Sequence, residues 1–94
     1  MMSPRISGIR VTPASTRDRR TGLRAYVTFV IDDWLCVDGI TVRSTAGGEP
    51  VLSFPVKTDR RGVKRPVVWP IGRDARQAIE AAIFEFIGCK GGEL

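Results

Sequence analysis

The sequence contains no histidine. It therefore lacks the usual general base near neutral pH and the commonest metal ligand in proteins. The two cysteines, Cys36 and Cys89, lie far apart, and two thiols without histidine cannot complete a zinc site of the usual four-ligand kind. They are also too few for the disulfide framework of a small secreted domain, so we expect both to be reduced thiols.

Long apolar runs are missing as well. The first residues, Met1 to Arg5, lack the apolar core of a signal peptide. No run approaches the roughly 20 residues that are needed to span a bilayer. We therefore expect a cytoplasmic protein without a membrane partner.

The composition is that of one ordinary globular domain. Of 94 residues, 43% are hydrophobic and 27% are charged, which is typical of a folded chain rather than a disordered one. A chain of this length buries roughly two-thirds of the surface that its unfolded form exposes, enough for one modest core. We predict a single domain over residues 1–94, with a folded core over 6–88 and short flexible ends at 1–5 and 89–94.

Positive charge is concentrated in two segments. Twelve of the 15 basic residues are arginine, and the formal net charge is +5. Residues 1–24 carry +5 and residues 57–65 carry +4, whereas residues 31–56 carry −3. Both basic segments adjoin strand-like sequence and contain turn residues, which predicts charged loops held on a rigid sheet.

Hydrophobic periodicity predicts several strands followed by one helix. Apolar residues alternate strictly over residues 23–31, with Tyr26 on the less apolar face, as in a half-buried strand. Apolar residues at helical spacing predict an amphipathic helix over 73–87. The combination predicts an α+β fold, a small antiparallel β-sheet of about five strands with one C-terminal amphipathic α-helix on one face. The expected strands are 6–12, 23–31, 34–43, 50–57 and 66–71, with a polar loop over 13–22 and a basic loop over 58–65.

Particular residues predict the turns, bulges and ends of these elements. Asp32 and Asp33 predict a tight turn between two strands. The alternation of apolar residues changes phase near Asp38 and Gly39, which predicts a β-bulge at a glycine. Gly88 is expected to end the helix in the left-handed conformation.

No catalytic arrangement is evident. Gly47-Gly48 lacks the Lys-Ser/Thr of a phosphate-binding loop. The adjacent carboxylates at the predicted hairpin tip point apart, whereas a two-carboxylate mechanism needs the groups across a cleft. Cys36 has no histidine to activate it and is expected to be buried in its strand. We therefore expect no enzyme activity, no cofactor, no metal site and no small-molecule substrate.

The basic segment at residues 57–65 is the strongest functional candidate. A solvated surface is the ordinary interpretation of such a run. Arginine outnumbers lysine, however, and the guanidinium fork suits phosphates and base edges. Crowded cations repel one another unless carboxylates or a polyanion lie near, which favours contact with nucleic acid. Trp34 and Trp69 lie at strand positions, and for Trp69 packing in the core or at an interface is favoured over stacking on a base.

Several short motifs follow one another in a fixed order. They are Ile9-Arg10-Val11, Asp38-Gly39-Ile40-Thr41-Val42, Phe54-Pro55-Val56-Lys57, Trp69-Pro70-Ile71, and Arg76 ahead of the apolar helix stripe. Over roughly residues 6–88 this order and spacing resemble the SpoVG family, also called the septation or stage V sporulation protein G family. The family has His-Asp-Ile-Lys-Val, Met-Pro-Ser-Lys and His-Pro-Ile in place of the second, third and fourth motifs.

The resemblance implies a small bacterial cytoplasmic protein with a sheet and a C-terminal helix, which forms homodimers and is not an enzyme. It implies binding to DNA, and in some members RNA, and a regulatory role that affects septation, sporulation and virulence genes. Nucleic-acid contacts are implied at the basic hairpin and at the start of the helix. Carried over by position, the expected nucleic-acid-binding residues are Lys57, Arg60, Arg61, Lys64, Arg65, Arg73 and Arg76.

The chain departs from the family pattern at three places. The loop at residues 58–62 is more basic than the family's Thr-Pro-Asp-Gly, the helix entry at 72–75 lacks the polar capping residues, and the first loop is longer and richer in arginine. Two functions are therefore considered. One is a homodimeric nucleic-acid-binding regulator, and the other is a protein-interaction adaptor in cell division whose arginines meet acidic surfaces.

Overall fold

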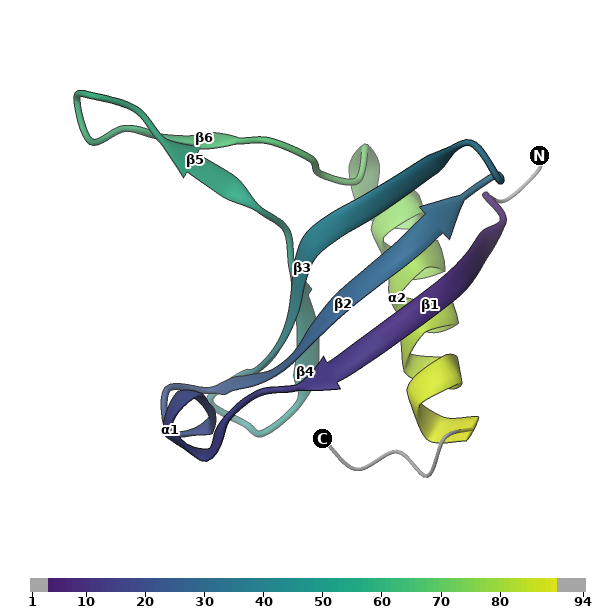
Figure 1. Ribbon diagram of the computed structural model, residues 1–94, viewed down its shortest axis with the longest axis horizontal. Coiled ribbons are helices and arrows are strands. Elements are labelled where there is room, and N and C mark those ends of the chain that lie inside the picture. Colours follow the sequence, from purple (N-terminus) through teal and green to yellow (C-terminus); the bar gives the residue numbers. More distant parts are fainter. Residues whose placement is uncertain (1–3, 90–94) are drawn as a thin grey trace.

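An antiparallel sheet of four strands, in the order β1-β2-β3-β4, forms the centre of the molecule. The computed structural model describes residues 4–89, and the predicted flexible ends fall largely on residues 1–3 and 90–94, which lie outside that range. Figure 1 shows helix α2 across one face of the sheet and a two-stranded hairpin projecting away from it. The elements are β1 (Ile6–Pro13), α1 (Thr16–Arg19), β2 (Leu23–Ile31), β3 (Leu35–Ser44), β4 (Pro50–Ser53), β5 (Val56–Thr58), β6 (Lys64–Pro66) and α2 (Gly72–Cys89). The predicted α+β class and C-terminal helix are confirmed.

The core lies between the sheet and α2. Alternate residues of β2, including Val27 and Phe29, are buried on the face that the helix covers, as the strict alternation predicts. Ile79, Ile83 and Ile87 recur every four residues along α2 and pack into the same cluster. The other face of the sheet is not covered by the helix (Figure 1).

Two predicted features of the sheet, the turn after β2 and the bulge in β3, are confirmed. Asp32 and Asp33 form the turn between β2 and β3, with positive φ angles of 53° and 57°, the conformation that a two-residue hairpin turn of type I′ requires. Val27 pairs with Ile40 and Phe29 with Val37, so β3 has one extra residue, at the predicted bulge.

The segment after β4 differs from the prediction. A single strand over 50–57 was expected, but the strand is interrupted between β4 and β5. Pro55 lies in this interruption and lacks the N–H that a β-ladder needs. Residues 67–71, placed in a final strand by their apolar character, form no strand, and Val67 N–H makes one hydrogen bond, of 3.1 Å, to Pro55 O. Pro66 and Pro70 have no backbone N–H, so neither can donate a hydrogen bond on either side of Val67.

Smaller predictions also fail. Helix α2 runs through Gly88 to Cys89, so Gly88 does not end the helix, and its φ is not positive. Cys36 is exposed rather than buried, because it faces the side of the sheet that α2 leaves open. Trp34 and Trp69 are 88% and 57% exposed, which rules out core packing for both. The predicted polar loop over 13–22 contains the short helix α1.

Between residues 4 and 89 there is no helix whose length and apolar character would let it cross a membrane.

Candidate nucleic-acid interface

Strands β5 and β6 and the turn between them form a projecting hairpin, residues 56–66, here called the basic hairpin (Figure 1). Lys57 pairs with Arg65, and Thr58 pairs with Lys64. Directly opposed residues of an antiparallel pair share a face, so Lys57 and Arg65 place two like charges side by side, which destabilises the pairing by itself. All three cations are exposed.

The turn of the basic hairpin is closed by backbone hydrogen bonds. Asp59 N donates to Val63 O at 2.9 Å, and Gly62 N donates to Asp59 O at 3.0 Å. Gly62 has a φ of 80°, which glycine adopts without the steric cost that a side chain imposes. This geometry presents Arg60 and Arg61 at the exposed tip of a defined turn.

The Asp59 carboxylate organises this tip. Its Oδ1 accepts from Arg61 N at 2.9 Å and from Val63 N at 3.0 Å, and its Oδ2 accepts from Arg65 Nε at 3.1 Å. The Val63 amide is the largest cause that lowers the pKa of Asp59, with partial desolvation acting against it and the Arg65 and Arg61 donors acting with it. The carboxylate therefore stays ionised and offsets one of the hairpin's cations.

An acid titration tests this role of Asp59. Because its folded pKa lies below the usual value of about 3.9, ionisation stabilises the tip above that pH, and the stabilisation is lost as pH falls through the folded pKa. We expect the Val63 amide to keep its hydrogen-bonded NMR shift until the pH is below about 3.9 and then to lose it. Asp59→Asn, which does not titrate, is the control, and a transition at or above the free-aspartate value would contradict the assignment.

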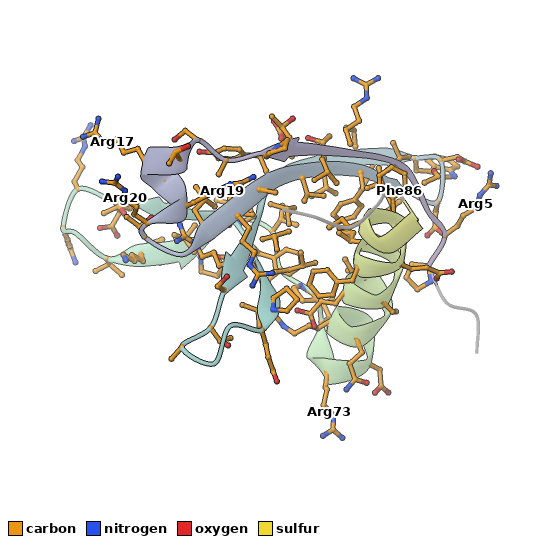
Figure 2. All side chains as sticks on the ribbon, turned by 90° about the horizontal axis from the view of Figure 1, so that it is seen from below. Arg5, Arg17, Arg19, Arg20, Arg73 and Phe86 are labelled. Carbon is orange, nitrogen blue, oxygen red and sulfur yellow. The ribbon has the colours of Figure 1, made fainter. Side chains whose placement is uncertain are left out.

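The two predicted arginines on α2 lie outside the basic hairpin. Figure 2 shows Arg73 pointing away from the sheet at the beginning of α2. Arg76 is turned inward, where its Nη1 donates to Leu52 O at 3.1 Å and lies 3.6 Å from Glu80 Oε2. Its guanidinium also lies 5.2 Å from the centre of the Phe54 ring, within cation–π range. The structure therefore engages Arg76 within the protein and leaves Arg73 exposed.

Glu80 also contacts the backbone of Leu52. Its Oε2 accepts from Leu52 N at 3.2 Å, so Arg76 and Glu80 together satisfy both backbone polar groups of Leu52. Glu80→Ala leaves that partly buried donor without its acceptor, and we expect the free energy of unfolding to fall by about 1–3 kcal/mol in urea titrations. Glu85→Ala removes an exposed carboxylate from the same helix and should change it by less than about 0.5 kcal/mol. Equal effects of the two substitutions would refute the role of Glu80.

Comparison with known proteins identifies the family of this chain. A family model for SpoVG matches residues 4–86. The chain belongs to the SpoVG family. It is 29% identical over 80 residues to proteins named "Putative septation protein SpoVG" in Borreliella burgdorferi strains ZS7 and B31, and the match covers 85% of this chain and 81% of each relative. The expected family resemblance is thus confirmed.

This SpoVG-family chain carries a second basic surface that sequence reasoning did not assign. Arg17, Arg19 and Arg20 are exposed on and just after α1. Figure 2 shows them together at one end of the molecule, with Arg5 at the other. The signal was present in the sequence as the +5 charge of residues 1–24, but charge alone did not show that the arginines share a corner.

Proposed function

We propose that this member of the SpoVG family is a nucleic-acid-binding regulatory protein, which binds DNA and also RNA and takes part in gene regulation of the septation and sporulation type. It acts in the cytoplasm, as a homodimer and without catalysis. The basic hairpin makes the principal contacts, mainly to phosphates, with Arg60 or Arg61 able to reach base edges from the tip.

One observation carries this proposal. Four cations of the basic hairpin, Lys57, Arg60, Arg61 and Lys64, form no ion pair with any carboxylate in residues 4–88, whereas Arg65 is paired with Asp59. A rigid turn holds them in solvent and away from the sheet. Unneutralised cations on a projecting element attract a polyanion and release its counterions on binding.

The exposed apolar segment that follows the hairpin supports the homodimer. Val67, Trp69 and Ile71 are 55%, 57% and 87% exposed. Several large apolar residues exposed close together are typical of an interaction surface. A second copy that covers them would hold two basic hairpins at a fixed separation.

A second candidate function is a protein-interaction adaptor in cell division. The relatives' name, which refers to septation, favours it. So do the exposed Trp34 and Leu35 at the start of β3, where aromatic and aliphatic side chains can anchor a protein partner. In an adaptor, affinity for nucleic acid is weak and incidental.

Titration with mixed-sequence duplex DNA, single-stranded DNA and RNA at two salt concentrations separates the two functions. A regulator binds at least one of them more tightly than the roughly 10⁻⁴–10⁻⁶ M of non-specific binding at physiological salt. Dissociation constants confined to that range, with no preference for any sequence, would favour the adaptor. Light scattering in parallel measures the oligomeric state, and a monomer at every concentration would refute the homodimer.

A further inference from the structure

Helix α1 is fixed to the end of the sheet at which β1 and β2 are joined. Ser15 Oγ accepts from Asp18 N at 3.1 Å and caps the helix. Gly22 N donates to Arg19 O at 3.1 Å, and Ser44 N, at the end of β3, donates to Gly22 O at 2.8 Å. The arginines of α1 are therefore carried on an anchored element rather than on a free loop.

The three arginines of α1 are not neutralised by carboxylates of the described residues. Arg17, Arg19 and Arg20 are exposed, and within residues 4–88 none of them forms an ion pair. Asp18, between them, is half-buried, and its Oδ2 accepts a hydrogen bond of 3.3 Å from the Tyr26 hydroxyl. The carboxylate thus faces the sheet, whereas Arg17 and Arg20 lie at the outer end of the molecule and Arg19 lies on the other side of α1 (Figure 2).

Tyr26 lies beside α1 on the face of the sheet that α2 does not cover. It pairs with Thr12 of β1 and with Thr41 of β3, whose short side chains flank the ring, and it is 45% exposed. Burial and Asp18 raise the pKa of Tyr26, and the charge of Arg43, which is exposed on the same face of β3, lowers it. An exposed aromatic ring with cations on either side is what single-strand-binding proteins offer to a base and its phosphates.

We propose that Tyr26, Arg43 and the three arginines Arg17, Arg19 and Arg20, here called the α1 surface, bind single-stranded nucleic acid, with a base stacked on Tyr26 and phosphates on the arginines. The inference rests on the proposed function and names a substrate class for it. Duplex DNA keeps its bases stacked on one another, so the ring cannot stack on them, and we expect the duplex to bind through the basic hairpin instead. The α1 surface and the basic hairpin project from the same side of the molecule, at separate corners (Figure 1).

Two substitutions of Tyr26 test the stacking. A poly(dT) oligonucleotide and a mixed-sequence duplex of equal length are titrated by fluorescence anisotropy. Tyr26→Thr removes the ring and keeps a good strand former on an exposed face, and it should weaken poly(dT) binding about 5- to 140-fold while duplex binding is unchanged. Tyr26→Phe keeps the ring without the bond to Asp18 and should bind poly(dT) as the wild type does. Equal poly(dT) affinity of the wild type and Tyr26→Thr would overturn the stacking.

A triple variant tests the arginines, which are exposed and form no ion pair within residues 4–88. Arg17→Ala, Arg19→Ala and Arg20→Ala together should reduce the dependence of log K on log salt for poly(dT) by about 2, because each phosphate contact of a single strand contributes about 0.7. An unchanged slope would overturn the α1 surface. If poly(dT) binding instead depends on the basic hairpin alone, the inference fails and the proposed function stands. If the wild type binds no nucleic acid, both fail.

Discussion

Replacing Arg60, Arg61 and Lys64 with alanine is expected to lower the salt dependence of duplex DNA binding by about 2.7 in log K against log salt, since each phosphate contact contributes about 0.9. Between about 50 and 200 mM salt, the wild type should then lose about 40-fold more affinity than the variant. These three cations have no carboxylate partner in the part of the chain that the structure describes, so their removal leaves no buried charge unpaired. Filter binding or anisotropy over a salt series measures the effect.

The control for this variant carries the same loss of charge elsewhere. The triple alanine variant of Arg17, Arg19 and Arg20 removes three exposed cations from α1 and should leave the salt dependence for duplex DNA close to that of the wild type. If both variants lower the slope equally, net charge rather than the basic hairpin governs binding. If neither does, the assignment of the hairpin is wrong.

The largest effect on stability is expected at Ile83. This residue is fully buried in the cluster that joins α2 to the sheet. Ile83→Ala removes apolar contacts and leaves a cavity, which costs about 2–5 kcal/mol. Because small domains have about 5–15 kcal/mol of stability in total, we expect a fall in Tm of about 8 °C or more, at about 4–8 °C per kcal/mol.

Ile71 supplies a control of the same residue type. It is 87% exposed, so Ile71→Ala should change the free energy of unfolding by less than about 0.5 kcal/mol when the chain is monomeric. The same variant reports on the homodimer, because a loss of self-association would place Ile71 in the interface. Calorimetry that finds the two isoleucines equally sensitive would contradict the position of the core.

The strength of local patterns decided how much of the fold could be predicted. The alternation of β2 and the helical spacing of α2 are direct consequences of burying one face, so they revealed the core face of each element. The bulge at Gly39 was also predictable, because one extra residue reverses the alternation. Residues 67–71 were wrongly predicted to form a strand, because an apolar run does not show whether a neighbouring strand exists to pair with it.

The same limit applies to the candidate site. The charge run and its turn residues were enough to place five cations on one hairpin. They were not enough to show that Asp59 would bind Arg65, which depends on the register of the hairpin. Nor did they show that Arg76 would turn toward Leu52, which depends on how distant segments pack. Cys36 was misplaced because the prediction relied on how often free cysteines are buried, whereas the face of β3 that carries Cys36 is exposed.

The contacts of Arg76 and Glu80 with Leu52 have a consequence for solubility. β4 is an outer strand of the sheet, and outer strands with free N–H and C=O groups act as templates on which another chain can add a strand and start aggregation. Because side chains of α2 occupy both groups of Leu52, that position of β4 has no backbone hydrogen bond to offer an incoming strand. The helix thus hinders the addition of another strand at this position of β4.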